Sequence, residues 1–153
     1  MKKFLFLFFF LLTSALVHAQ YGTINAILDR LEERRGLNQN LKNIHLDDVK
    51  FVLIKDFEDH TERNFIILKG KNATFAEVFD DKATGTTNSN VFSGDAVRSN
   101  RNVISVRFDQ LEGKKIPVPV TKTLLLTQQQ KILYLIDLNT KDRWIEESAL
   151  NRK

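Results

Sequence analysis

The stretch Val103-Ile104-Ser105-Val106-Arg107-Phe108-Asp109 alternates between apolar and polar side chains. Ile104, Val106 and Phe108 fall on one face, and a period of two residues is typical of an antiparallel strand with one buried face. A turn at residues 112–114, which contains a glycine, leads into a further strand pattern. The sequence therefore predicts an antiparallel sheet that includes these two segments.

Other segments also carry strand patterns. Residues 51–54 and 65–68 are continuous apolar runs, which are typical of strands that are covered on both faces. Residues 132–138 form the last expected strand, and residues 75–79 are expected to be either a strand or one helical turn. The whole pattern predicts five or six strands, most of them antiparallel.

Two prolines mark the beginning of the strand that follows the turn at 112–114. Pro117 and Pro119 lie on one face of this strand, and Ile116, Val118 and Val120 lie on the other. Because proline has no N–H to donate to a neighbouring strand, we expect this part of the strand at an edge of the sheet. An open edge accepts another chain by strand addition, so Ile116, Val118 and Val120 are predicted to be a partner-binding edge.

The segment before the strands has a helical pattern. Between residues 23 and 35 the apolar side chains recur at the spacing of one helix face, and Gly36 suits the position just after a helix end. An amphipathic helix is therefore predicted over residues 23–35. Residues 37–48 are expected to form either a second short helix or a loop that tucks apolar side chains under the first.

These elements predict a single α+β domain over residues 20–153, in which the N-terminal amphipathic helix packs on a five- to six-stranded, mostly antiparallel sheet. A small β-barrel or sandwich with a helical N-terminus is the alternative. Residues 81–102 are rich in Asp, Gly, Ser, Thr and Asn, which favour turns. A long polar loop is therefore expected at 81–102.

Residues 1–19 have the pattern of a cleavable signal peptide. Lys2 and Lys3 precede an apolar run, and small side chains precede the expected cut after Ala19. The apolar run is shorter than the roughly twenty residues that span a bilayer. We therefore expect export to a periplasm or out of the cell, with no permanent transmembrane segment after signal removal. The chain has no cysteine, which excludes a lipoprotein anchor, a disulfide and a thiolate metal site.

The charges are nearly balanced. The chain has 23 basic and 19 acidic side chains, and Lys2 and Lys3 of the predicted signal supply two of its net four positive charges. No run of basic residues is longer than a pair. Nucleic-acid-binding proteins usually concentrate basic residues along one face or helix, so no nucleic-acid partner is predicted.

The densest group of metal-ligand residue types lies between the apolar runs 51–54 and 65–68. Carboxylates suit Ca²⁺, and a histidine among carboxylates suits Zn²⁺ or Mn²⁺. The spacing matches neither an EF-hand loop nor a pair of histidines on a helix, so a solvated polar loop is the competing interpretation. The candidate metal ligands are Asp56, Glu58, Asp59, His60 and Glu62.

A second candidate site would bind a small ligand. Arg98 and Arg101 would hold an anionic or sugar-like ligand, with Tyr134 or Trp144 as a stacking surface. The competing interpretation is that both arginines are exposed and that the tryptophan fills one end of the core.

Catalytic motifs are missing from the sequence. It contains no glycine-rich phosphate loop and no serine in a G-x-S-x-G turn. His45 would suit a general base, with Asp47 or Asp48 as the group that orients it, although a histidine in an ordinary loop is the competing interpretation.

We therefore predict an exported, non-enzymatic protein without a cofactor, which binds another envelope or exported protein. The alternative is a module that binds a small apolar or sugar-like ligand, and a metal-dependent hydrolase that uses His60 is the third hypothesis. Partner binding predicts an exposed apolar patch or an open strand edge. Ligand binding predicts a pocket instead.

Overall fold

A computed structural model gives the structure of the chain and describes residues 30, 31, 33–99 and 102–150. The chain divides into two units, Met1–Arg35 and Gly36–Lys153. The described residues of the first unit are helical. The predicted signal peptide and most of the predicted helix over 23–35 lie outside the described residues.

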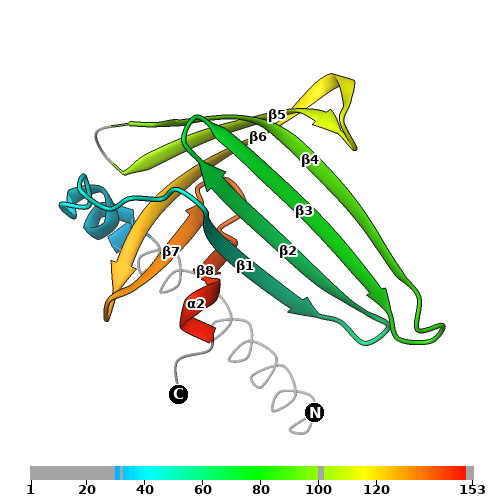
Figure 1. Cartoon of the computed structure of the whole chain (residues 1–153). Helices are drawn as coiled ribbons and strands as arrows, with labels where there is room; N and C mark the ends of the chain where they lie inside the picture. The colour runs from blue at the N-terminus through cyan, green and yellow to red at the C-terminus, as the bar shows by residue number, and fades with distance from the viewer. Residues whose placement is uncertain (1–29, 32, 100–101, 151–153) are drawn as a thin grey trace, which may run out of the picture. The chain divides into compact units, whose positions relative to one another are not determined.

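The second unit is a closed barrel of eight antiparallel strands, and each strand pairs with its neighbour along the chain (Figure 1). The pairing of β1 with β8 closes the barrel. The strands are β1 (Val49–Asp56), β2 (His60–Lys69), β3 (Asn72–Asp81), β4 (Thr87–Arg98), β5 (Val103–Leu111), β6 (Lys114–Gln129), β7 (Ile132–Asp137) and β8 (Arg143–Glu146), and the short helix α2 (Glu147–Leu150) follows them.

The predicted α+β fold with five or six strands is therefore wrong, and the barrel alternative fits better. β8 follows the strand that was expected to be the last, and four residues are too few to show a sequence period. No helix is packed on an open sheet, as far as the described residues go, because the sheet closes on itself and buries its own inner face.

The prediction of a long polar loop at residues 81–102 is also wrong, because β4 occupies most of this segment. β4 pairs with β3 from Thr87↔Asp80 to Asn72↔Asp95. Its first five residues are exposed, so neither face needed apolar side chains and no alternation marked the strand. Backbone pairing with β3 thus overrides the turn preference of Asn and Ser here.

The core fills the inside of the barrel. Ile104, Val106 and Phe108 of β5 are at most 2% exposed, which confirms the strand predicted from their alternation. An eight-stranded barrel has an interior just wide enough for side chains to fill or for one small ligand. The largest fully buried side chains are Trp144, Phe51, Phe108 and Ile66.

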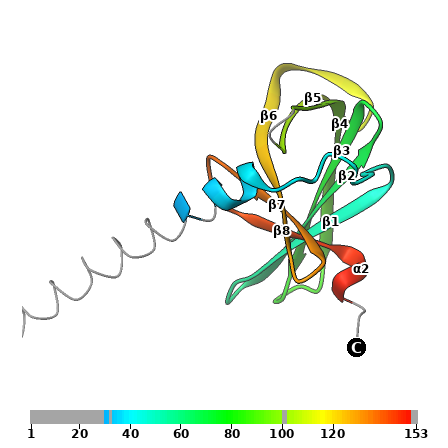
Figure 2. The ribbon, with the colours of Figure 1, turned by 90° about the vertical axis from the view of Figure 1, so that its left-hand side faces the viewer.

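Residues 40–48 cross one end of this barrel (Figure 2). They have no regular secondary structure, and Leu41 is buried while Ile44 and Leu46 pack against the core. Of the two forms predicted for residues 37–48, residues 40–48 form the loop, but their apolar side chains cover the barrel rather than pack under a helix. Residues 37 and 38 are helical, so the helix continues past Gly36, where it was expected to have ended. We call residues 40–48 the covering segment.

Two polar side chains, the buried Asn102 and the half-buried Gln39, fasten the chain just before the covering segment to the barrel. The Asn102 amide donates hydrogen bonds to the carbonyls of Gly36 and Gln39, at 3.0 and 2.7 Å. The Gln39 side chain exchanges two hydrogen bonds with the backbone of Gln128, at 3.0 and 2.8 Å. At the other end of the covering segment, the Asp48 N–H donates to the Leu68 carbonyl at 2.8 Å.

None of the described helices is long and apolar enough to cross a membrane.

Candidate functional site

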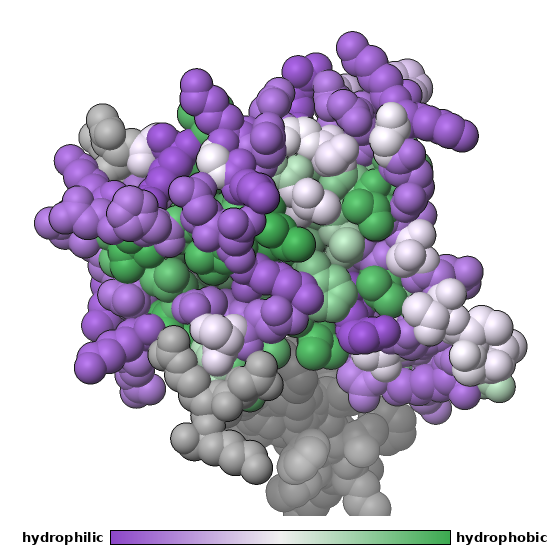
Figure 3. All heavy atoms as spheres, in the orientation of Figure 1, coloured by the Kyte–Doolittle hydropathy of each residue, from purple (hydrophilic) through white to green (hydrophobic). Residues whose placement is uncertain are grey.

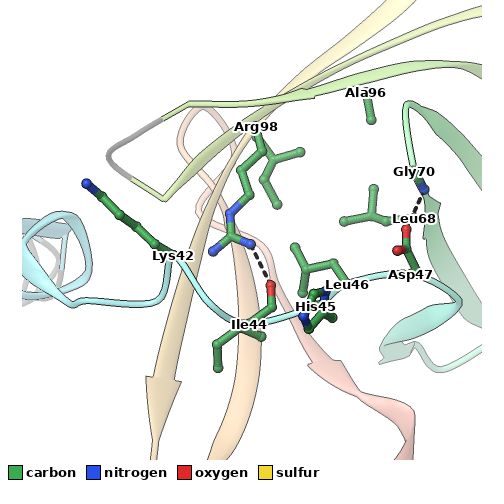
Figure 4. A pocket seen from close by; sticks show the side chains of 10 residues that line it. Lys42, Ile44, His45, Leu46, Asp47, Leu68, Gly70, Ala96 and Arg98 are labelled. Atoms are coloured by element: carbon green, nitrogen blue, oxygen red, sulfur yellow. Dashed lines mark hydrogen bonds between the residues drawn. The ribbon is translucent and has the colours of Figure 1, made fainter.

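A pocket of about 270 Å³ lies at the end of the barrel that the covering segment crosses (Figure 4). The covering segment supplies one wall. The end of β2 with the turn after it, the end of β4 and the start of β5 supply the others. Antiparallel neighbours bring these ends together because β2 runs toward this end, β3 runs away from it and β4 returns.

The base of the pocket is apolar. Leu68, Ala96 and Ile104 point inward from three different strands and are at most 8% exposed. Ile44 and Leu46 of the covering segment line the pocket from the opposite side and are half-buried. The volume lies just below the range of roughly 300–1,000 Å³ that is usual for ligand pockets, so the pocket suits a small molecule.

Arg98 is the charged side chain set deepest at this pocket. Its guanidinium donates to the Ile44 carbonyl at 2.8 Å and to the Leu41 carbonyl at 2.5 Å. Figure 4 shows the side chain descending from β4 toward the covering segment. Burial lowers the pKa of this guanidinium, because burial disfavours a charge. Arg98 is therefore both a tether for the covering segment and a positive group at the pocket.

Three more polar side chains lie at the rim. Lys42, His45 and Asp47 are exposed residues of the covering segment. The Asp47 carboxylate accepts a hydrogen bond from the Gly70 N–H at 2.7 Å, which anchors the segment to the β2–β3 turn. The Asp47 carboxylate thus binds a backbone N–H and makes no hydrogen bond to His45 in the described structure. The general base predicted from His45 and Asp47 is therefore not assembled.

The predicted ligand-binding set does not come together. Arg98 lines the pocket, but Arg101 lies outside the described residues. Trp144 is 1% exposed inside the barrel and offers no free stacking face. Tyr134 lies on the outer face of β7, because it pairs with Ile145 next to the inward pair Leu135↔Trp144. Of the three members of the predicted set that the structure describes, only Arg98 therefore lines the pocket.

The predicted metal cluster is arranged differently from a metal site. No group of three or more His, Asp or Glu side chains in the described part of the chain is placed to hold a metal ion. The Lys82 ammonium lies 2.7 Å from Asp56 Oδ1 and also donates to the Phe57 carbonyl. Glu58 is exposed. The Asp56 carboxylate therefore binds a cationic side chain of the protein itself.

His60 is the centre of the remaining contacts in this turn. Its Nδ1 lies 2.6 Å from Asp59 Oδ1 and its Nε2 lies 3.5 Å from Glu62 Oε1. Its ring stacks on Phe57 with 4.5 Å between centroids. The hydrogen bond to Asp59, together with the weaker contact with Glu62, raises the pKa of His60. The same hydrogen bond lowers the pKa of Asp59.

The predicted partner-binding edge proves to be a bulge. The β5–β6 register runs from Gln110↔Lys115 directly to Phe108↔Val120, so residues 116–119 have no partners in it. A bulge tolerates proline, which explains the two prolines in this strand. Val118 is 77% exposed, whereas Val120 packs against the core, so the predicted residues do not share one surface.

β6 nevertheless has an open side. β7 pairs only with residues 124–129 of β6, so residues 114–122 have no strand partner on that side among the described residues. The Thr123 carbonyl accepts the Leu138 N–H on this side, so alternate residues, including Pro119, direct their backbone groups the same way. Because Pro119 has no N–H, it weakens the open edge as a template for another strand.

An apolar row crosses the outer face, where Val52 is 4% exposed and Phe65 and Ala76 are half-buried. Val52, Phe65, Ala76 and Val91 are successive partners across β1, β2, β3 and β4. Val91 is 38% exposed, and Ile54, next to this row, is 54% exposed. Figure 3 shows hydrophobic spheres gathered over the middle of this face. The outer face of the barrel is therefore only partly polar.

Inside the barrel, Lys122 is a charged residue that the sequence reasoning missed. Its ammonium lies 5.0 Å from the Phe75 ring centroid, 5.4 Å from that of Trp144 and 3.6 Å from the buried Asp137 carboxylate. The ring faces and the carboxylate compensate its charge. The sequence pattern indicates this inward position, because Lys122 alternates in phase with the apolar residues Val120 and Leu124.

No sequence pattern marks Leu68, Ala96 and Ile104 as pocket residues. They come from three strands and have the pattern of ordinary core positions, and only the barrel topology brings them to one end.

The chain matches no protein-family model, no curated protein and no solved structure.

Proposed function

We propose that this chain is a non-enzymatic binding protein that holds a small molecule in the pocket between the covering segment and the barrel end. The observation that carries the proposal is a cavity of about 270 Å³ with an apolar base and one half-buried guanidinium. Such a combination of apolar lining with a few polar groups is typical of ligand pockets.

The roles of the lining side chains favour binding over catalysis. Arg98 and Asp47 are both bonded to backbone groups that position the covering segment. The ten described residues that line the pocket include no serine, threonine or cysteine nucleophile. The signal-like pattern of residues 1–19 supports a location in a periplasm or outside the cell.

The test fills the pocket. Ala96→Phe places a ring at the pocket base, and the matched control Val97→Phe adds the same ring at a neighbouring residue that is 67% exposed and does not line the pocket. Both proteins are screened by NMR against a library of small organic acids, alcohols, amides and sugars. We expect ligands that shift the amide signals of Gly70 and Ile104 in the original protein and in Val97→Phe, but not in Ala96→Phe. A library without such a ligand contradicts the proposal.

A second candidate function is the binding of an exported or envelope protein. The exposed side chains of Val91 and Ile54, at the outer apolar row, favour it, since exposed apolar patches commonly mark interaction sites. The test is crosslinking in the producing cell with Val91→Lys and the control Val97→Lys. Loss of one dominant crosslinked partner in Val91→Lys alone would support this candidate, and the absence of any partner would contradict it.

A further inference from the structure

We propose that the ligand of the end pocket is a small carboxylate with a short apolar chain, whose carboxylate binds Arg98. This inference rests on the proposed function and specifies the chemistry of its ligand. The first step is the charge balance of the pocket, where Arg98 has no carboxylate within ion-pair distance among the described residues. The two partners of its guanidinium are neutral carbonyls, those of Leu41 and Ile44.

The missing counter-charge is not supplied by the rest of the lining. Among the lining residues that the structure describes, Asp47 is the one acidic side chain, and it accepts the Gly70 N–H instead. Lys42 and His45 at the rim add no negative charge and have no ion pair in the described structure. A half-buried cation without a counter-ion is costly, and a bound anion would lower that cost.

The Arg98 guanidinium has N–H donors that the covering segment does not use. An arginine carries five N–H donors in a planar fork, and the two hydrogen bonds to the covering segment use two of them. The remaining donors suit a carboxylate, which arginine binds through paired N–H groups. The guanidinium therefore tethers the covering segment and still has donors for an anion.

The rest of the pocket determines the other half of the ligand. Leu68, Ala96 and Ile104 form an apolar base, which a short hydrocarbon chain fills without unpaired polar groups. A free phosphate would place oxygens against these side chains, where they find no donors. The volume of about 270 Å³ admits a small acid rather than a long lipid.

The experiment compares hexanoate, hexanamide and inorganic phosphate by NMR titration of the purified protein. We expect hexanoate to bind roughly tenfold more tightly than hexanamide, which has the same chain and no charge. Phosphate is expected to cause no shift at Gly70 or Ile104. Arg98→Gln should remove the preference for hexanoate, while the control Arg107→Gln, the same charge change at an exposed β5 residue outside the pocket, should keep it.

Because Arg98→Gln also releases two hydrogen bonds to the covering segment, Arg98→Lys serves as a second variant. It keeps the charge and should retain a preference for hexanoate even if its affinity falls. Equal binding of hexanoate and hexanamide at the pocket overturns the carboxylate inference and leaves the proposed function intact. Binding of phosphate as tight as that of hexanoate overturns the apolar half of the inference. If none of the three binds while another library compound does, only the inference fails.

Discussion

Gly94 is the single residue at which the backbone of the barrel approaches itself most closely among the described glycines. A Cβ at this position would lie 1.9 Å from the Arg107 carbonyl oxygen and 2.7 Å from the Phe108 Cα. The register between β4 and β5 shifts between Ser93 and Gly94, which bends the strand. No side chain fits there without a movement of backbone.

We therefore expect Gly94→Ala to destabilise the protein by about 3 kcal/mol or more, at the upper end of the cost of overpacking. Urea unfolding at constant pH measures the change in the free energy of unfolding. The control is Ser93→Ala, the adjacent residue, for which we expect a change within about 0.5 kcal/mol. Similar stability of the two variants would contradict the close approach of β4 and β5.

His60 makes the stability depend on pH. The folded protein raises the pKa of His60 above its ordinary 6.5, mainly through the hydrogen bond to Asp59, so this contribution is fully present below pH 6.5 and is lost as the pH rises through the raised value. Asp59 has its pKa lowered by the same bond, so its contribution is lost in acid. The pair therefore stabilises most between these two limits.

The measurement is the melting temperature of His60→Gln against that of the original protein from pH 4 to 9. We expect a difference that is largest near pH 5 to 6 and shrinks toward pH 9. In an Asp59→Asn background the effect of His60→Gln should vary much less with pH, since the main partner is gone. A difference that grows with rising pH would show that the sign is wrong.

At the scale of elements, the covering segment depends on a few hydrogen bonds to the barrel. Asn102 is 2% exposed, donates to the carbonyls of Gly36 and Gln39, and has a left-handed backbone with φ of 61°. Asn102→Gly removes both donors without straining that backbone, because glycine adopts positive φ freely. The two carbonyls then lose a buried partner.

We expect Asn102→Gly to cost about 2–4 kcal/mol of stability, from two carbonyls left without a buried donor. Hydrogen exchange of the Gln39 and Ile44 amides should also become faster, because both lie in the region that the side chain fastens. The control Asn90→Ala changes an exposed side chain of β4 and should be nearly neutral. Unchanged exchange in Asn102→Gly would mean that the Asn102 side chain does not hold the covering segment in place.

The sequence predicted strands that have one solvent-exposed face and one buried face. β5 was found because Ile104, Val106 and Phe108 alternate with polar residues. β4 was missed because its first half, including Asn88 and Asn90, is exposed and has no apolar period to detect. Closure into a barrel was missed as the main prediction, since it depends on the pairing of β1 with a four-residue strand.

The candidate site was predictable only in part. An arginine in a polar stretch suits an anion, which makes Arg98 a predicted ligand-binding residue, and the structure places it in the pocket lining. The pocket itself joins the covering segment to Leu68, Ala96 and Ile104, which are far apart in the sequence. No local pattern reports that juxtaposition, because it arises from the order of strands around the barrel.

At the scale of the whole molecule, the barrel has one weak seam. β1 and β8 share two residue pairs, Phe51↔Glu146 and Val52↔Ile145, whereas β2 and β3 share ten. Few shared pairs mean that the seam opens at a lower free energy than the whole molecule unfolds. The closed barrel is thus least stable where its first strand, β1, pairs with its last strand, β8.

Native-state hydrogen exchange measures this difference. We expect protected amides of β8 to exchange by local opening at about 2 kcal/mol or more below the free energy of global unfolding. Amides of β2 that bond to β3 should exchange only by global unfolding and serve as the internal reference. Equal opening free energies for β8 and β2 would show that the seam is as strong as the rest of the barrel.

The order of the strands also bears on how the molecule folds. Every strand pairing except β1–β8 joins neighbours along the chain, so hairpins form at a small cost in loop closure. The contacts of Gly36 with Asn102 and of Gln39 with Gln128 span 66 and 89 residues and belong to the late steps. The pocket then exists only once folding is nearly complete. A bound ligand would consequently slow unfolding and leave the folding rate almost unchanged.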